Sequence, residues 1–241
     1  MTAAKEIVRR VDTLGTDRIF SISDLGLSAD WWSNIKVKLG RMVKDGTLVK
    51  IANGKYYRPR TSILGPVPPS TEELVKDLLY DDGKLVGYLT DYSIWDSMGL
   101  TSQFSSTIFI GLNRRKDPTT RDGRDIRFVL QPNEISEQNV NLLQILDTIK
   151  FIKKIPDTKI ENTITRLREI FTNLDDNELV SLVELSRKYP PRVRAIVGAI
   201  MEAIGKHGIA ASIKNTLNPL TEYRIGIEQS ILPSLSNWNI I

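Results

Sequence analysis

Hydrophobic positions near the N-terminus recur at helical spacing. One stripe comprises Trp31, Ile35, Leu39, Met42 and Val43. Steps of three and four residues place these side chains on one face of an α-helix, so the stripe predicts an amphipathic helix that packs this face inward. Asp30 is expected to cap the start of the helix through its carboxylate, and Gly46 is expected to end it.

Further patterns flank this helix. Residues 2–14 predict a first helix whose inward positions are Ala4, Ile7, Val8 and Val11. Residues 18–26 predict a short strand and a second helix that opens near Ser23. Downstream, branched and aromatic residues surround Asn53-Gly54, a strong β-hairpin signal. Helix, short strand, helix, basic helix and two-stranded wing is the order of a winged helix-turn-helix, which we predict for residues 1–60.

The next segment predicts a domain boundary and a small α+β unit. Four of the eleven prolines fall within residues 58–70, so residues 61–70 are expected to form an extended, proline-rich connector. In residues 71–135, Ser70 or Thr71 is expected to cap a helix, and a strand or turn leads into a helix that closes at Gly99. The segments "STIFIGLN" and "RDIRFVLQP" predict two strands joined by a polar loop.

From residue 136 onward the pattern is helical. Ile160, Ile164, Leu167 and Phe171 form one apolar stripe, and prolines at 156 and 190–191 separate the expected helices. Residues 136–241 are therefore predicted to form a helical bundle that caps the middle unit. The predicted fold class is α+β, with an N-terminal winged helix-turn-helix, a small α/β middle unit and a C-terminal helical bundle. Residues 71–241 together form the expected C-terminal domain.

Composition adds constraints on the environment of the chain. With 241 residues, 41% of them hydrophobic, the chain can bury a substantial core. It has no cysteine, which suits a reducing compartment. No apolar run approaches about 18 residues, and the polar start "MTAAKEIVRR" lacks the apolar region of a signal peptide. These features predict a cytoplasmic protein without a membrane span.

Positive charge is concentrated at one end of the chain. Residues 1–60 hold 12 of the 33 Lys and Arg residues and 6 of the 29 Asp and Glu residues, so this segment carries +6 and the remainder −2. Such asymmetry indicates a polyanionic partner for the N-terminal segment. The outer face of the basic helix adds small residues that allow close approach to a groove. The candidate DNA-binding residues are Ser33, Asn34, Lys36, Lys38, Arg41, Lys44, Lys50, Lys55 and Arg58.

Signs of catalysis are weak. The single His207 lies at an expected helix end, where a charge near the C-terminal dipole is its expected role. Asp81-Asp82 and Asp175-Asp176 are interpreted as a turn and a helix cap. No nucleophile is paired with a base, and no glycine-rich cofactor loop or set of metal ligands is evident. We therefore expect no enzyme activity, no catalytic residues, no metal and no cofactor. A nuclease is disfavoured for want of metal ligands.

Four segments resemble a known family. The segments are "GKYYRPR", "PVPPS", "GYLTDYSIWDSMGLTSQ" and "YPPRVRAIVGAIMEAIG", and together they resemble AbiEi-type antitoxins of bacterial type IV toxin–antitoxin systems. The resemblance spans Lys5 to about Gly205. It departs at the bulky Trp31-Trp32 pair and at Asp91, where a small residue is more usual in the family.

Membership would imply two activities. The N-terminal domain would bind inverted repeats in its own promoter and repress transcription, with contacts carried over to the basic positions Lys36, Lys38, Arg41, Lys44, Lys50, Lys55 and Arg58. The C-terminal domain would neutralise a nucleotidyltransferase-like toxin without a stable complex. Two alternatives remain open at this stage. The chain could be a winged-helix protein-interaction scaffold, or a stand-alone transcriptional regulator without a toxin.

Overall fold

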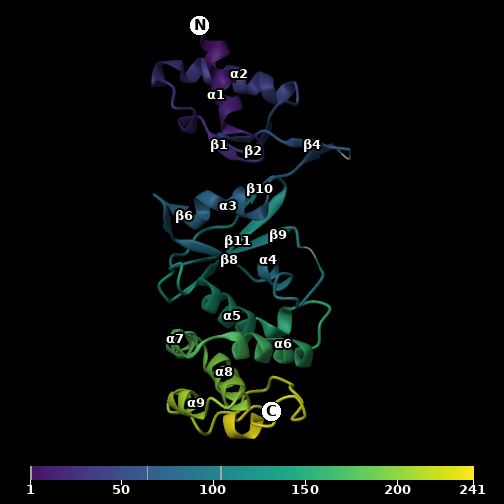
Figure 1. The fold of residues 1–241 in the computed structure, drawn as a ribbon, viewed down its shortest axis with the longest axis vertical. Coiled ribbons are helices and arrows are strands. Elements are labelled where there is room, and N and C mark those ends of the chain that lie inside the picture. Colours follow the sequence, from purple (N-terminus) through teal and green to yellow (C-terminus); the bar gives the residue numbers. More distant parts are fainter. Residues whose placement is uncertain (1, 64, 104) are drawn as a thin grey trace. The chain divides into compact units, whose positions relative to one another are not determined.

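The chain folds as a mixed α+β protein in two units whose sequences interleave (Figure 1). The computed structural model describes residues 2–63, 65–103 and 105–241. The first unit comprises Met1–Leu78 and Pro118–Ile126, and the second comprises Leu79–Asp117 and Arg127–Ile241. The segment 71–78, expected to belong with the C-terminal half, therefore folds with the N-terminal residues.

The first unit begins with helices and a three-stranded sheet. In chain order its elements are α1 (Ala3–Leu14), β1 (Ile19–Ser21), 3-10 turns at Ser23–Leu25 and Ala29–Trp31, α2 (Trp32–Lys44), β2 (Val49–Ala52) and β3 (Lys55–Tyr57). The antiparallel sheet has the order β1-β3-β2. The hairpin expected around Asn53-Gly54 is confirmed, with Gly54 at a φ of 72°. The expected second helix is only a single 3-10 turn.

The predicted apolar stripe forms the core between α1 and α2. Ile35, Leu39 and Met42 are at most 4% exposed and pack with Ile7 and Val11 of α1. Trp31 and Val43 are partly buried against the same cluster.

Two local expectations in this unit are wrong. Ala4 is exposed rather than inward. Asp30 does not cap α2, because it lies inside the preceding 3-10 turn, where its carboxylate accepts a hydrogen bond from the Ser28 hydroxyl (3.2 Å). Trp31 occupies the N-cap position and offers no capping side chain.

The proline-rich segment is also structured. Instead of an extended connector it forms a hairpin of β4 (Arg60–Ser62) and β5 (Gly65–Val67). The chain continues into α3 (Thr71–Leu79), which Ser70 caps by accepting a hydrogen bond from the Glu73 amide (3.1 Å). Later in sequence, β10 (Thr119–Arg121) pairs with the first residues of β11 (Arg124–Leu130) and completes this unit.

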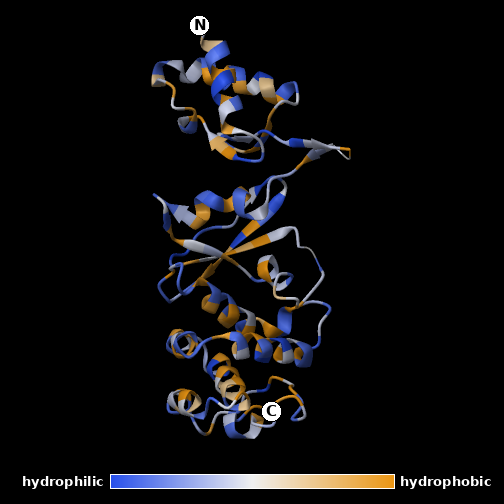
Figure 2. Cartoon of the chain, viewed as in Figure 1, coloured by the Kyte–Doolittle hydropathy of each residue, from blue (hydrophilic) through white to orange (hydrophobic). Residues whose placement is uncertain are grey.

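The second unit contains a small sheet and a set of helices. Its elements are β6 (Tyr80–Asp81), β7 (Lys84–Leu85), β8 (Gly87–Thr90), α4 (Tyr92–Trp95), β9 (Thr107–Leu112), the end of β11, α5 (Val140–Lys150), a 3-10 turn at Ile152–Lys154, α6 (Ile160–Asn173), α7 (Asp176–Ser186), α8 (Pro191–Ala203), α9 (His207–Lys214) and a 3-10 turn at Leu235–Trp238. Strands β8 and β9 are antiparallel, with Gly87 opposite Leu112. Hydrophobic residues concentrate along α5 and α8 (Figure 2).

The helical prediction for the C-terminal region holds as far as Lys214. Beyond it the chain is irregular apart from the last 3-10 turn, and its apolar side chains pack on the helices. Asp175 caps α7 in a capping box with Glu178, as expected. Asp82 and Gly83 form the expected turn between β6 and β7. His207 begins α9, so its expected position near a helix C-terminus is wrong.

Helix α8 is the centre of the core of the second unit. Its residues from Ala195 to Met201 are buried. A Cβ atom added at Gly198 would overlap the ring of Trp238, whose indole N–H donates to Glu202 (2.8 Å). The absence of a side chain at position 198 therefore allows the C-terminal segment to close over the helix.

We predict that Gly198→Ala destabilises the protein by about 1–3 kcal/mol, because the added methyl group must displace a buried tryptophan. The measurement is the free energy of unfolding in urea. Gly208→Ala in α9 is the matched control, since nothing lies within 4 Å of its added Cβ. It should be neutral or stabilising by up to about 1 kcal/mol. Equal stability of Gly198→Ala and the wild type would contradict the packing described.

Candidate nucleic-acid interface

The outer face of α2 combines exposed cations with small side chains. Ser33, Asn34, Lys36, Arg41 and Lys44 are all exposed, and a Cβ added at Gly40 would meet no atom within 4 Å. Within the described part of the chain, Lys36, Arg41 and Lys44 form no ion pair. These side chains are therefore available to an external anion.

Lys38 lies at the edge of this face. It is half-buried, and its charge acts on Asp45 at the end of α2. Hydrogen bonds from the Thr47 hydroxyl and amide, together with the charge of Lys38, lower the pKa of Asp45. Lys38 is therefore close enough to Asp45, at the C-terminal end of α2, for the two charges to interact.

The β2–β3 hairpin offers fewer unpaired cations than expected. Lys50 on β2 is exposed. Lys55 on β3 instead forms an ion pair with Asp77 of α3 (2.7 Å), and its side chain is only 26% exposed. Lys55, expected as a DNA contact, is therefore engaged by an acid of its own unit.

Asp77 is a shared counter-ion. Arg121 of β10 donates to both of its carboxylate oxygens (2.5 and 2.8 Å) and to the carbonyl of Leu74 (2.9 Å). Burial alone would raise the pKa of Asp77, but the hydrogen bonds from Arg121 and Lys55 lower it to about 2. The carboxylate thus stays ionised and holds α3, β10 and β3 together. The Asp122 amide adds a hydrogen bond to the Ile51 carbonyl of β2 (3.1 Å).

Arg58 is also engaged within the protein. Its guanidinium donates to the Asp12 carboxylate of α1 (2.8 Å), 46 residues earlier in the sequence. Arg58 is thus removed from the set of free cations. Of the expected site residues, Ser33, Asn34, Lys36, Arg41 and Lys44 are exposed on α2, and Lys50 is exposed on β2.

Two apolar residues on α2 were not among the expected site residues. Trp32 is 49% exposed and Val37 is 54% exposed. Val37 lies on the same outer face as Arg41, whereas Trp32 lies at the start of the helix. The apolar stripe included Trp31, and no role was predicted for Trp32. The pair of tryptophans was the signal that could have indicated Trp32.

A buried polar centre in the second unit is a separate candidate. Asp147 of α5 is 1% exposed. Its carboxylate accepts hydrogen bonds from the hydroxyls of Tyr88 (2.6 Å), Thr90 (3.0 Å) and Tyr189 (2.8 Å). Gln131 donates to both tyrosine oxygens (2.7 and 2.8 Å). Burial raises the pKa of Asp147, although these donors oppose the shift. Because every one of these groups has a partner, we assign the centre to stability.

Asp91 is less well satisfied. It lies between β8 and α4 at a φ of 53° and a ψ of −133°, a backbone conformation that costs energy for a residue other than glycine. The side chain is 6% exposed, and its Oδ1 atom has no hydrogen-bond partner. Burial and the negative charge of Asp147 raise the pKa of Asp91 to about 7, although Lys154 and Lys150 oppose the shift.

No metal site is evident in the described ranges, because nowhere do three or more His, Asp or Glu residues gather as ligands. Nor does any helix among the described residues have the length and apolar character to span a membrane.

The raised pKa of Asp91 predicts a pH dependence of stability. Between about pH 4 and 7 the folded protein holds a proton that the unfolded chain has released, so the free energy of unfolding falls as pH rises. Asp91→Asn should remove about 2–4 kcal/mol of this fall. The measurement is urea unfolding at several pH values. Asp96→Asn, at an exposed neighbour, should keep the wild-type dependence. The prediction fails if all three proteins show the same dependence.

Comparison with known proteins gives little further constraint. No protein-family model matches the sequence, and no curated protein is significantly similar to it. Among solved structures, the chain is similar to the crystal structure of the RV2827C protein from Mycobacterium tuberculosis. The TM-score is 0.48 and the sequence identity 13%, over 92% of this chain and 84% of that chain.

Proposed function

We propose that the first unit is a winged helix-turn-helix that binds duplex DNA through α2. The observation that carries the proposal is the outer face of α2, where Lys36, Arg41 and Lys44 are exposed without counter-ions beside the small residues Ser33 and Gly40. The order of elements and the β1-β3-β2 sheet also support it.

In the proposed complex, α2 enters a groove of the duplex. Small residues let the helix backbone approach closely, and the cations reach phosphates on either side. Phosphate contacts supply most of the affinity and fix the orientation, whereas side chains such as Asn34 can reach base edges. Lys50 adds a contact from the wing. Lys55 and Arg58 lie outside this interface, because Asp77 and Asp12 already neutralise them.

A protein-interaction scaffold is the second candidate. The exposed Trp32 and Val37 favour it, since apolar side chains on a helix surface are typical of contacts with another protein. Both candidates use α2. They differ in whether the cations of this helix or its apolar residues dominate binding.

We predict that Arg41→Ala and Lys44→Ala each weaken binding to duplex DNA from the promoter of the gene, because each removes a phosphate contact. Each variant should also reduce the slope of log affinity against log salt concentration by about 0.9. The melting temperature should hardly change, since both side chains are exposed. Gel shifts at about 50–200 mM salt measure the affinities.

Two matched variants make this test specific. Lys76→Ala removes an exposed cation of α3 in the same unit and should leave DNA binding unchanged. Lys55→Met should lower the melting temperature, because it takes a partner from Asp77, and should bind DNA like the wild type once folded. If Arg41→Ala and Lys44→Ala bind like the wild type while Trp32→Ala abolishes capture of a protein partner, the scaffold replaces the DNA-binding proposal.

We further propose that the protein is an AbiEi-type antitoxin that represses its own promoter and opposes a nucleotidyltransferase-like toxin in the cytoplasm. This step rests on the four sequence segments that resemble the family. The second unit, which lacks the cationic helix face, is the proposed antitoxic part. A stand-alone regulator would share the first activity and lack the second.

For this proposal we predict that the two activities separate. The double variant Arg41→Ala/Lys44→Ala should lose repression of a promoter reporter, yet still restore growth of cells that express the nucleotidyltransferase-like toxin encoded beside its gene. Growth curves and reporter activity measure the two effects. Absence of such a neighbouring gene, or failure of the wild type to restore growth, would leave a stand-alone regulator as the function.

A further inference from the structure

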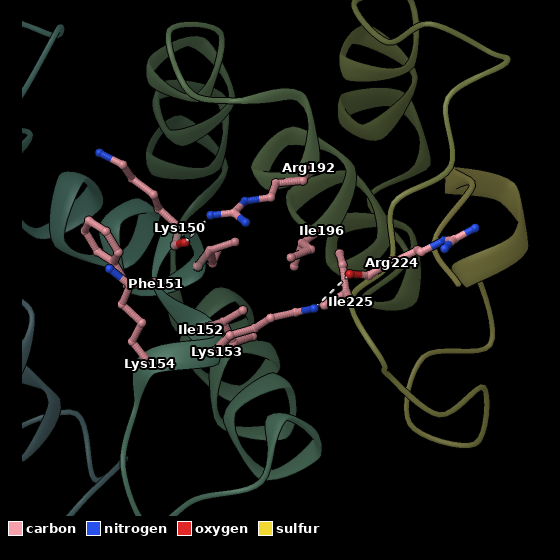
Figure 3. A pocket seen from close by; sticks show the side chains of 10 residues that line it. Lys150, Phe151, Ile152, Lys153, Lys154, Arg192, Ile196, Arg224 and Ile225 are labelled. Atoms are coloured by element: carbon pink, nitrogen blue, oxygen red, sulfur yellow. Dashed lines mark hydrogen bonds between the residues drawn. The ribbon is translucent and has the colours of Figure 1, made fainter.

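A pocket with an apolar floor lies within the second unit (Figure 3). It is enclosed by the end of α5, the 3-10 turn that follows, the start of α8 and the segment at residues 224–225, and its volume is about 110 Å³. Four isoleucines line it: Ile149, Ile152, Ile196 and Ile225, each at most 5% exposed. These residues come from three segments that are far apart in the sequence, so the floor exists only in the folded unit.

Two cations are fixed at the rim of this pocket. The ammonium group of Lys153 donates to the Arg224 carbonyl (2.9 Å), and the guanidinium of Arg192 donates to the Lys150 carbonyl (2.9 Å). Figure 3 shows both side chains reaching across the lined space from different elements, whereas the charged ends of Lys150 and Arg224 point away from it. The two rim cations are thus held in place by backbone carbonyls rather than by carboxylates.

Most N–H donors of Lys153 and Arg192 have no partner among the described residues. A lysine ammonium has three N–H donors and an arginine guanidinium has five, and each of these two groups spends one on a carbonyl. None of the ten residues that line the pocket is acidic. Lys150 and Lys154, whose ammonium groups lie about 5 Å from the centre of the Phe151 ring, add further positive charge nearby. Fixed cations beside an apolar floor favour an anion as occupant.

We propose that this pocket binds a small organic carboxylate, with the carboxylate between Lys153 and Arg192 and the apolar body on the isoleucine floor. Arg192 can engage a carboxylate through two parallel N–H donors, and Lys153 adds a third. At about 110 Å³ the pocket is smaller than an apolar cavity of about 150 Å³ that holds benzene, so it encloses a short branched chain or part of an aromatic ring.

Other occupants match the pocket less well. Inorganic phosphate satisfies the cations but covers none of the isoleucine surface. A neutral apolar molecule covers that surface but desolvates the cations without pairing them. The same carboxylate chemistry has two sources, a free acid or the C-terminal residue of a peptide. Both present one carboxylate on one apolar group.

The test is calorimetric titration of the full-length protein with benzoate, N-acetyl-leucine, benzyl alcohol and inorganic phosphate. Saturable binding of benzoate or N-acetyl-leucine at one site is expected, and whichever binds more tightly identifies the source. Benzyl alcohol, which lacks the charge, and phosphate, which lacks the apolar body, should bind at least about tenfold more weakly.

Variants of the rim decide whether the binding occurs in this pocket. Lys153→Met and Arg192→Met keep the apolar stem and should each weaken binding of the better acid at least about tenfold, with unchanged melting temperatures. Lys188→Met is the matched control, because Lys188 likewise donates to a backbone carbonyl, that of Pro132 (3.2 Å), but does not line the pocket. Absence of saturable binding, equal weakening in all three variants, or phosphate binding as tightly as both acids would overturn the proposal.

Discussion

The carboxylate of Asp77 is the group on which the arrangement of the first unit depends. It binds Arg121 and Lys55 at once, and so joins α3, β10 and the β2–β3 hairpin. A half-buried carboxylate without these partners would carry a large desolvation cost. Its pairing explains why residues 71–78 and 118–126 fold with the N-terminal segment instead of with the residues around them in sequence.

Ion pairs within this unit also determine which of its cations are neutralised and which stay available to a partner. Two cations that follow β3 pair with acids near the N-terminus. Arg58 pairs with Asp12 of α1, and Arg60 pairs with Asp17 in the loop after α1. Among the described residues, Lys36, Arg41 and Lys44 on the outer face of α2 form no ion pair, so these cations remain free. The proposed DNA interface therefore uses only part of the N-terminal positive charge, because Arg9, Arg10, Lys55, Arg58 and Arg60 form pairs within the unit.

In the second unit, the buried carboxylate of Asp147 accepts hydrogen bonds from hydroxyl donors instead of from cations. At the Asp147 centre three hydroxyls donate to a buried carboxylate, and the Gln131 amide donates to two of those hydroxyls, which joins β8, α5 and the residues after α7 into one network. Asp91 lies nearby with a strained backbone and an unsatisfied oxygen. Around the isoleucine pocket the cations are fixed by carbonyls and keep their charge available. The two proposed partners therefore differ in size: a duplex along a helix face for the first unit, and a small anion in a pocket for the second.

The sequence by itself determined the local features of this protein. Apolar spacing located α1, α2 and α6, prolines located breaks between the C-terminal helices, and Asn53-Gly54 located the hairpin, because periodicity and turn chemistry act within a few residues. Helix α9 was not predicted, since His207 was expected at the end of a helix and not at the start of one. Only the tertiary structure decided which cations are free, since Asp77 lies 22 positions after Lys55 and Asp12 lies 46 positions before Arg58. The pocket floor likewise depends on contacts between distant segments, at residues 149–152, 196 and 225. Ion pairs and cavities are set by where the chain brings side chains together in space, and no local pattern encodes that.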